Sequence, residues 1–242
     1  MSIKIGIIGY AGRMGQAIGK AVRTHPAAML CGGLEREAKP DLQALDPSFV
    51  VTNQPEILFP QCDVLIDFSH ATATADYARL AVKYGKAFVS GTTGLDESAK
   101  AALSDAAKHI PLLYASNTSL SLVVMKQLVK QAARLLRDHD YDIAIVDEHH
   151  RWKKDAPSGT AKTLGEMALA GNGGSPEPAY AAIRAGAIVG EHEVIFAGQG
   201  ETIRLRHSVT DRDIFARGAV QAAVWLHNKA SGFYSMDDVL AA

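Results

Sequence analysis

The sequence Ile3-Lys4-Ile5-Gly6-Ile7-Ile8-Gly9-Tyr10-Ala11-Gly12-Arg13-Met14-Gly15 predicts how this chain folds. An apolar, β-branched run ends in a glycine-rich turn, and a helical pattern follows the turn. Glycines at GxxGxxG spacing allow a tight turn and let the backbone approach a pyrophosphate at the amino terminus of the helix. The stretch therefore predicts a strand, a dinucleotide-binding loop and a helix; a glycine turn that serves packing alone is the alternative.

The residues that follow repeat the alternation of strand and helix. Apolar runs occur at 28–34, 64–68, 87–90 and 112–115, and helical patterns occur at 72–83 and 97–109. Apolar strands that alternate with helices are typical of a parallel sheet covered on both faces. We expect an α/β fold with a Rossmann-type parallel sheet domain that comprises residues 1–120 and 212–242.

The pattern changes after about residue 120. A long helical period covers 120–137, strands are expected at 141–146, 181–185, 193–196 and 202–207, and a second helix is expected at 160–169. We expect these residues, 121–211, to form a smaller α+β substrate-binding and oligomerisation domain with an antiparallel sheet. The helical pattern at 214–229 returns to the first domain, so the second domain is an insertion.

Composition limits the class of function. Of 242 residues, 48% are hydrophobic and 21% are charged, and the net charge is −1. This balance favours neither nucleic acid nor an anionic membrane as a partner. Cys31 and Cys62 have no metal-type spacing, and the amino terminus shows no signal peptide, so we expect a cytoplasmic protein without disulfides.

Polar residues that follow the strands predict where a dinucleotide binds. Glu35 stands at the end of the second strand, where a carboxylate accepts hydrogen bonds from the adenine ribose, and Arg36 is placed to pair with a 2′-phosphate. Small hydroxyl and amide residues follow the fourth and fifth strands, at 90–94 and 115–118. They suit the nicotinamide end of a cofactor, although such residues are also common turn formers.

The segment at 147–160, Asp-Glu-His-His-Arg-Trp-Lys-Lys-Asp-Ala-Pro-Ser-Gly-Thr, carries the chemistry. Two histidines and three basic residues can donate protons and attract anions, and the Pro-Ser-Gly-Thr turn can open a helix and present free N–H groups. Together with the glycine loop, the segment indicates a nicotinamide-dependent reductase of a small carboxylated molecule. Alternatively, His149 is a structural histidine bonded to Asp147 or to another acid. Trp152 is expected to be a packing residue. We expect no metal, because there is no HExxH and no third ligand.

With these motifs the chain resembles the 4-hydroxy-tetrahydrodipicolinate reductase (dihydrodipicolinate reductase) family of diaminopimelate and lysine biosynthesis. The resemblance covers nearly the whole chain and rests mainly on the string from His149 to Thr160. It implies NADPH or NADH as the cofactor, a small dicarboxylate substrate and a homotetramer. This sequence departs from the family pattern at Thr118–Leu122, where an aromatic residue and an amide residue that are usual in the family are missing. The loop at 171–178 is also shorter than in many members.

Residue roles follow from the resemblance position by position. His149 is implied as the catalytic acid and Lys153 as its partner in proton delivery, with His150, Gly159 and Thr160 as substrate-binding residues. The implied cofactor contacts are Gly9, Tyr10, Ala11, Gly12, Arg13, Met14, Glu35, Arg36, Gly91, Thr92, Thr93, Ala115, Ser116, Asn117 and Thr118. His192, His207 and His227 receive no role.

Two other functions stay open on the sequence. One is a different two-domain NAD(P)-dependent dehydrogenase that acts on an amino-acid-related imine or keto acid. The other is a non-catalytic dinucleotide sensor that has kept its Rossmann domain. The combination of His149, Lys153 and Thr160 favours an enzyme, because a proton donor, a cation and an anion-binding turn occur together.

Overall fold

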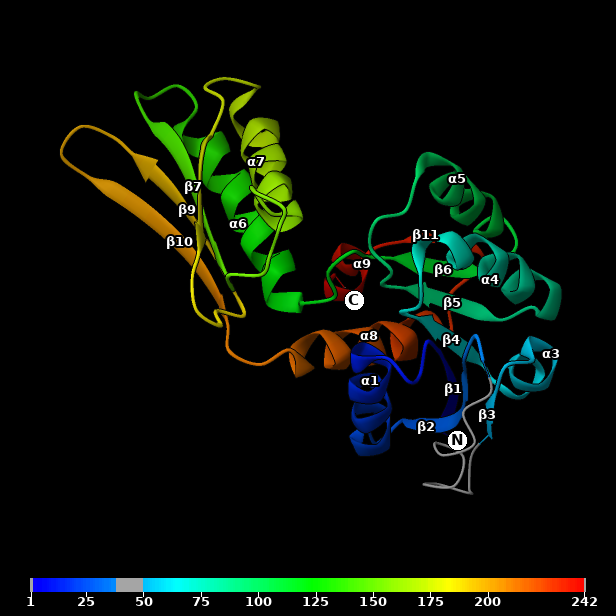
Figure 1. Ribbon diagram of the computed structural model, residues 1–242. Helices are drawn as coiled ribbons and strands as arrows, with labels where there is room; N and C mark the ends of the chain where they lie inside the picture. Colours follow the sequence, from blue (N-terminus) through cyan, green and yellow to red (C-terminus); the bar gives the residue numbers. More distant parts are fainter. Residues whose placement is uncertain (1, 38–49, 242) are drawn as a thin grey trace. The chain divides into compact units, whose positions relative to one another are not determined.

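The glycine-rich turn follows the first strand of a parallel sheet in the computed structural model, which describes residues 2–37 and 50–241. The chain divides into two units, Met1–Thr118 with Asp213–Ala242, and Ser119–Arg212. Each unit has its own sheet and its own covering helices (Figure 1). No helix among the described residues is long and apolar enough to cross a membrane.

Among the described residues the first unit holds a seven-stranded, entirely parallel sheet in the order β11-β6-β5-β4-β1-β2-β3. Its strands are β1 (Ile3–Ile8), β2 (Ala28–Leu34), β3 (Val50–Thr52), β4 (Val64–Asp67), β5 (Ala87–Ser90), β6 (Pro111–Tyr114) and β11 (Gly232–Tyr234). The strand order reverses between β1 and β4, which is the point where open α/β sheets bind ligands.

Helices cover both faces of this sheet (Figure 1). Helices α1 and α8 pack together on one face, and α4 and α5 pack together on the other. The helices of the unit are α1 (Arg13–Thr24), α3 (Pro55–Leu58), the 3-10 turn η1 (Phe59–Gln61), α4 (Ala71–Tyr84), α5 (Glu97–Ala106), α8 (Asp213–Leu226) and α9 (Met236–Leu240). With α8 the chain returns to the first unit, which includes residues 213–241.

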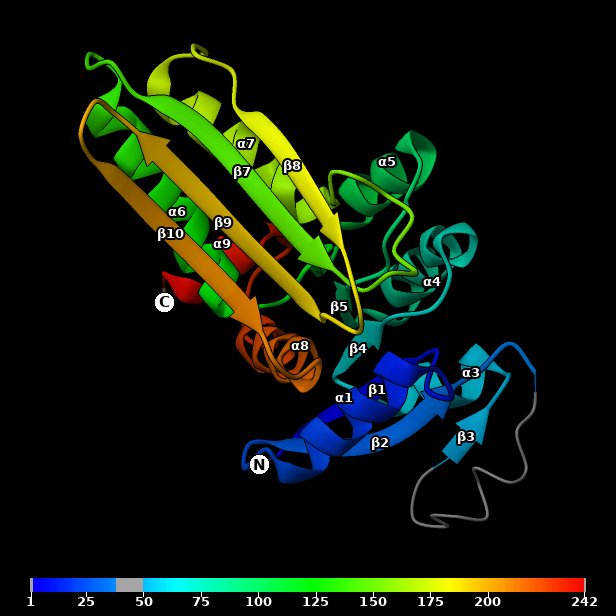
Figure 2. The same ribbon diagram turned by 60° about the vertical axis from the view of Figure 1, so that its left-hand side comes forward.

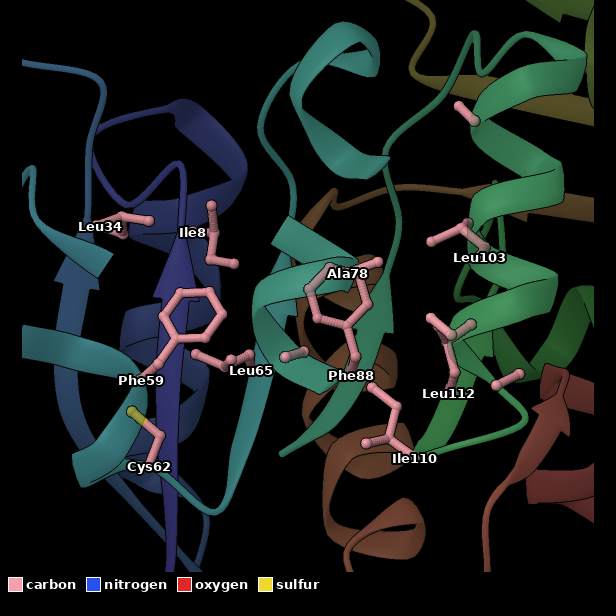
Figure 3. Packing of buried hydrophobic residues seen from close by; sticks show 14 of the residues in the cluster. Ile8, Leu34, Phe59, Cys62, Leu65, Ala78, Phe88, Leu103, Ile110 and Leu112 are labelled. Atoms are coloured by element: carbon pink, nitrogen blue, oxygen red, sulfur yellow. The ribbon is translucent and has the colours of Figure 1, made fainter. Parts of the chain in front are cut away.

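The core of the first unit lies between the sheet and helices α4 and α5. Figure 3 shows how side chains from neighbouring strands, such as Leu65 and Phe88, meet Ala78 of α4 and Leu103 of α5. All four are fully buried. Burial of this kind contributes roughly 1.5–3 kcal/mol for each large apolar side chain and fixes the strand ends that carry the polar loops.

The second unit is a four-stranded mixed sheet in the order β10-β9-β7-β8, with α6 and α7 on one face (Figure 2). Its elements are α6 (Leu120–Leu136), β7 (Asp142–His149), α7 (Gly159–Asn172), β8 (Ala179–Arg184), β9 (Gly190–Ala197) and β10 (Thr202–Val209). Alternate residues of β7 and β9, among them Ile145 and Val194, pack against Val129 and Leu164 of the two helices.

One expectation for this sheet was wrong. We expected an antiparallel sheet, but β8 pairs parallel with β7, and only β9 and β10 run antiparallel to their neighbours. The reason is the connection: α7 lies between β7 and β8, and a strand that returns through a crossover helix pairs parallel. This arrangement brings the end of β8 beside the end of β7. The α/β class with a second, smaller domain is otherwise confirmed.

Candidate active site

The glycine loop of the first unit is packed so closely that two of its glycines leave no room for a side chain. Gly9 has a φ of 79°, and a Cβ atom there would lie 2.9 Å from the carbonyl oxygen of Phe68. A Cβ atom on Gly15 would lie 2.2 Å from the carbonyl oxygen of Gly9. Both positions therefore require glycine, and the loop leads directly into the amino terminus of α1, where N–H groups lack intrahelical acceptors.

Within the loop, Ala11, Gly12 and Arg13 are exposed, whereas Tyr10 is buried with 4% of its surface accessible. The ring of Tyr10 packs toward Gly33 and Gly19, so only its backbone is available to a ligand. The Ala11 N–H donates to Oε1 of Glu35, which places this carboxylate at the loop. Arg36 is exposed beside it.

A pocket of about 280 Å³ opens at the carboxyl ends of the strands in the first unit. It is lined by Met14, Phe68, Ser69, Gly91, Thr92, Thr93, Ala115, Ser116, Asn117, Thr118 and Phe215. The structure thus brings together Met14 and both groups of residues expected at the nicotinamide end. The residues that sequence reasoning missed are Phe68, Ser69 and Phe215.

Phe215 could not be found by motif, because it comes from α8, almost a hundred positions along the chain from Thr118. The Thr118 Oγ1 hydroxyl donates to the Phe215 carbonyl oxygen at 2.7 Å, and a Cβ atom on Gly218 would lie 1.8 Å from the Thr118 carbonyl oxygen. Phe215 and Phe68 both line the pocket, so it has aromatic side chains although residue 118 is a threonine.

A buried carboxylate holds the pocket wall. Asp67 is fully buried, and its Oδ1 accepts from the Ser69 N–H and hydroxyl at 3.1 and 2.5 Å. Its Oδ2 accepts from the hydroxyls of Thr74, Thr92 and Ser90 at 2.8, 3.0 and 3.2 Å. These bonds satisfy the buried carboxyl group and fix Ser69 and Thr92 in the pocket wall. The sequence feature that could have identified Asp67 is its position as an acid at the end of an apolar strand.

In the second unit β7 places His149 on the same face as Asp147, because residues two apart in a strand share a face. The Asp147 side chain is fully buried, and its Oδ1 lies 2.8 Å from His149 Nδ1. Arg184, from the end of β8, donates Nη1–H to the same oxygen at 2.8 Å and Nη2–H to Oδ2 at 3.3 Å. Sequence reasoning named Asp147 as a partner of His149 but missed Arg184.

Electrostatics keep Asp147 ionised and His149 easily deprotonated. Burial alone would raise the pKa of Asp147, but Arg184, the Ser158 N–H and His149 outweigh it and hold that pKa at about 2. Burial lowers the pKa of His149, and Lys153 and Arg184 lower it further, whereas Asp147 raises it. Because an ionised carboxylate only accepts hydrogen bonds, His149 Nδ1 is the donor.

The turn before α7 presents two backbone N–H groups. The Ser158 N–H donates to Asp147 Oδ2 at 2.6 Å, and the Ser158 hydroxyl accepts from the Ala161 N–H at 3.2 Å. Gly159 and Thr160 lie between Ser158 and Ala161 in the chain. Their N–H groups occupy the first positions of the helix, which have no intrahelical acceptor. Gly159 is exposed and Thr160 is half-buried. The geometry suits a carboxylate at the helix amino terminus.

The basic loop lies between β7 and this turn. Lys153 Nζ is 2.8 Å from Asp155 Oδ1, and its side chain is only 23% exposed. His150 Nδ1 is buried and has no hydrogen-bond partner among the described residues. Trp152 was expected to pack, but it is 69% exposed, because it lies on the outside of a turn with its ring against His150 and Arg151.

Two histidines that received no role lie beside this cluster. His192 of β9 is opposite Asp147 in the sheet, its ring is 5.1 Å from that of His149, and its Nε2 is 3.2 Å from the Ser158 hydroxyl. His207 of β10 is opposite His192, and its Nε2 is 2.9 Å from the Ser121 hydroxyl. Burial lowers the pKa of His192 to about 4 and also lowers that of His207.

The residues present fit a dinucleotide. A loop closed to side chains, a helix amino terminus and a carboxylate at its edge match the needs of a pyrophosphate and an adenine ribose. The described residues contain no cluster of three or more His, Cys, Asp or Glu side chains that could hold a metal ion.

Known proteins resemble the chain over its whole length. Family models described as the N-terminus and the C-terminus of dihydrodipicolinate reductase match residues 3–118 and 121–240. The 4-hydroxy-tetrahydrodipicolinate reductase of Zymomonas mobilis is 44% identical over an alignment of 257 positions, which covers 99% of this chain and 97% of the relative. The enzyme of the same name from Stenotrophomonas maltophilia is 45% identical over 240 residues, or 98% of each chain.

Solved structures share the fold. A dipicolinate-bound dihydrodipicolinate reductase from Paenisporosarcina sp. TG-14 has a TM-score of 0.81 at 23% identity and covers 97% of this chain and 98% of its own. A scyllo-inositol dehydrogenase from Lactobacillus casei, solved with NAD(H) and scyllo-inositol, has a TM-score of 0.63 at 15% identity, over 99% and 93% of the chains. At these identities the structures show the fold alone.

Proposed function

The chain belongs to the dihydrodipicolinate reductase family, and we propose that it uses a nicotinamide cofactor to reduce 4-hydroxy-tetrahydrodipicolinate to tetrahydrodipicolinate in diaminopimelate and lysine biosynthesis. The reaction adds a hydride and a proton to the substrate and releases its hydroxyl as water. Each of the two units supplies one half of this chemistry.

One observation carries the substrate half of the proposal. His149, with its Nδ1 held by Asp147, and the free N–H groups of Gly159 and Thr160 project from one tightly bonded cluster. The N–H groups take one carboxylate of the dianionic substrate, with the Thr160 hydroxyl beside them. His150, whose buried Nδ1 has no partner among the described residues, takes part in binding. The second carboxylate interacts with the basic loop.

Proton delivery belongs to His149 and Lys153. A histidine can hold a proton near neutral pH and give it to a carbon next to the site of hydride addition. Lys153 keeps its ammonium in a partly covered position, where it favours the dianion and the negative charge that develops during the reaction. Its ion pair with Asp155 orients the ammonium group.

The cofactor half lies in the first unit. When bound, the nicotinamide supplies the hydride. The glycine loop, from Gly9 to Met14, holds the pyrophosphate, and the pocket residues Gly91 to Thr93 and Ala115 to Thr118 surround the nicotinamide. Glu35 accepts from ribose hydroxyls, which favours NADH, and Arg36 pairs with a 2′-phosphate, which favours NADPH. The two effects oppose each other, so both cofactors work, with a preference within about tenfold, or roughly 1.4 kcal/mol.

The protein forms a homotetramer through the sheet of the second unit. One face of this sheet packs on α6 and α7, and the other face presents Ala144, Val146, Ile195 and the 46% exposed Ile183. Apolar residues on an open sheet face are typically covered in a closed, symmetric assembly. Light scattering at micromolar concentration tests this: a tetramer is expected, and a monomer would refute it.

The activity itself is tested by the fall in NADPH absorbance when the product of the preceding pathway step is added. The reductase consumes NADPH only with that substrate. Turnover of a different imine or keto acid, with none of this substrate, would instead support another dehydrogenase. NADPH binding without turnover of any such compound would support a dinucleotide sensor.

A further inference from the structure

Asp147 is the residue on which the substrate cluster converges. Its carboxylate accepts four hydrogen bonds, from groups that come from three segments of the second unit. Oδ1 accepts from His149 Nδ1 and Arg184 Nη1, each at 2.8 Å, and Oδ2 accepts from the Ser158 N–H at 2.6 Å and Arg184 Nη2 at 3.3 Å. A fully buried carboxylate is costly unless it is satisfied in this way, so its presence needs a reason.

Arg184 secures the carboxylate from the other side. In addition to Asp147, its guanidinium donates to the Asp147 carbonyl oxygen at 3.2 Å, to the Ile183 carbonyl oxygen at 2.8 Å and to the Asp155 carbonyl oxygen at 2.7 Å. A planar, forked donor of this kind fixes both the position and the rotation of the carboxylate. The carboxylate oxygen that faces His149 is therefore held in place independently of His149.

The opposite edge of the His149 ring, which carries Nε2, faces Gly190. A Cβ atom built on Gly190 would lie 3.2 Å from Nε2 and 3.4 Å from Cδ2, so a side chain at position 190 would crowd this edge. Nδ1 points to a fixed carboxylate, and Nε2 points away from it. The two nitrogens of His149 are thus not equivalent, and the hydrogen bond to Asp147 decides which of them carries hydrogen in the neutral ring.

We propose that Asp147 is a positioning residue of the reductase: it accepts the Nδ1–H hydrogen bond of His149 and so holds the neutral ring as the Nδ1–H tautomer. Nε2 is then the atom that takes up a proton and, in the imidazolium form, delivers it to the substrate. Through the Ser158 N–H, Asp147 also sets the turn that presents Gly159 and Thr160. One carboxylate thereby aligns the proton donor with the carboxylate-binding N–H groups. The catalytic part of this inference rests on the proposed function; the tautomer does not.

The charge of Asp147 also supports the protonated form of His149. The charged and titratable groups around His149 are Asp147 on the same strand, Arg184 from β8, His192 from β9 and Lys153 from the loop. Of these, Asp147 favours the imidazolium, whereas burial, Lys153 and Arg184 oppose it. Removing this one negative charge therefore lowers the pKa of His149.

The first experiment needs no substitution in the cluster. Nitrogen-15 NMR of histidine-labelled protein above the pKa of His149 reports which ring nitrogen carries hydrogen, and the spectrum of His149→Gln identifies the His149 signals. We expect the Nδ1–H tautomer in the wild type. A predominant Nε2–H tautomer would overturn the proposal, whether or not the protein shows reductase activity.

The second experiment compares Asp147→Asn with Asp147→Glu and with Asp142→Asn, an exposed residue of the same strand. In Asp147→Asn we expect His149 to change tautomer and kcat to fall about a hundredfold or more, with the Kd for NADPH within twofold of the wild type. The loss of activity with rising pH should occur at a pH lower by about one. Asp147→Glu keeps a carboxylate and should restore most of kcat, and Asp142→Asn should match the wild type.

A merely structural role gives a different pattern. Asp147→Asn would then lower the melting temperature but keep both the wild-type tautomer and the wild-type pH profile, and that result would refute the proposal. If Asp147→Asn does not fold, Arg184→Lys replaces it: the carboxylate stays, so the Nδ1–H tautomer should persist although stability falls. Loss of this tautomer in Arg184→Lys while Asp147 is intact would contradict the assignment.

Discussion

The cofactor pocket of the first unit and the substrate cluster of the second are built from different materials. The pocket is formed by backbone and small side chains at strand ends, with Asp67 saturated by neutral hydroxyl and N–H donors beneath its wall. The cluster is formed by buried and half-buried ionisable side chains, namely Asp147, Arg184, His149 and His192. In the function proposed above, the first region recognises the cofactor by its shape, and the second acts on the substrate through charged groups.

This difference has a physical reason. A pyrophosphate and a ribose need donors at fixed positions, and a glycine backbone at a helix amino terminus supplies them without titratable groups. Proton transfer needs a group whose pKa lies near the working pH, which only a tuned side chain provides. Substitutions in the two regions should therefore affect different measurements, and that expectation can be tested.

The largest effect is expected for the proton donor. His149→Gln and Lys153→Ala should each lower turnover by about a hundredfold or more, because they remove the acid and the cation that assists it. The Kd for NADPH should stay within about twofold, because every residue that lines the cofactor pocket belongs to the first unit. Steady-state kinetics and fluorescence titration measure the two quantities. Loss of NADPH binding in either variant would break the comparison.

The next effect concerns pH and the second unit. The folded protein keeps His192 neutral down to a pKa of about 4, whereas the unfolded chain protonates it near 6.5. Between these two pH values the unfolded state binds more protons than the folded state. The contribution of neutral His192 to the free energy of unfolding is therefore complete above about pH 6.5 and is lost as the pH falls to 4. The lowered pKa values of His149 and His207 act in the same direction. The loss from His192 amounts to roughly 3 kcal/mol.

Urea unfolding at pH 7.5 and pH 5 measures most of this loss, roughly 2 kcal/mol, because pH 5 lies between the folded and the unfolded pKa of His192. His192→Gln should reduce the difference between the two pH values, because glutamine does not titrate. His139→Gln, at an exposed position of the same unit, serves as the control and should leave the difference unchanged. A wild-type protein that is equally stable at both pH values would show that the buried histidines are not held neutral.

A third effect separates the two cofactors. Arg36→Ala should weaken NADPH by roughly 1.5–3 kcal/mol, which is the usual contribution of a hydrogen bond to a charged group, and leave NADH nearly unchanged. Dissociation constants of both cofactors for the wild type and the variant decide the matter. Equal losses would mean that Arg36 supports the adenine or the fold. Arg137→Ala, at an exposed position after α6 in the second unit, is the matched control and should change neither constant.

The smallest effect contrasts one glycine from each region. Gly15→Ala places a methyl group 2.2 Å from the Gly9 carbonyl oxygen, so the unfolding free energy should fall by about 1–3 kcal/mol. Apart from its chain neighbours and the backbone of its own helix, no atom of the described residues lies within 4 Å of a Cβ built on Gly159. Gly159→Ala should therefore keep the unfolding free energy or raise it by at most about 1 kcal/mol. Urea unfolding of both variants is the measurement. Similar losses of unfolding free energy in the two variants would show that the two regions do not differ in how tightly their glycines are packed.

The sequence predicted the first unit well because its signals are local. The strand, the glycine turn and the helix that form the loop are contiguous, and residues at strand ends meet at one edge of a parallel sheet. Residues 115–118 could therefore be placed in the pocket with no knowledge of their neighbours. Phe215 could not, because its position depends on how α8 returns to the sheet.

The second unit was harder for the same reason. Asp147 and Arg184 meet only because β8 lies parallel to β7, and that pairing depends on a crossover through α7 rather than on any local pattern. His192 looked isolated in sequence, yet the antiparallel register of β9 sets it opposite Asp147. Trp152 was misjudged because hydrophobicity predicts burial on average and does not identify the outer residue of a turn.

The return of the chain to the first unit has a consequence for biosynthesis on the ribosome. Residues 119–212 are contiguous and emerge before Asp213–Ala242, which carry α8 and the edge strand β11. The second unit can therefore fold while the face of the first sheet that α8 covers is still bare. Completion of the first unit must wait for residues 213–241, so the nascent chain exposes the sheet face that α8 covers to chaperones until these residues have been synthesised.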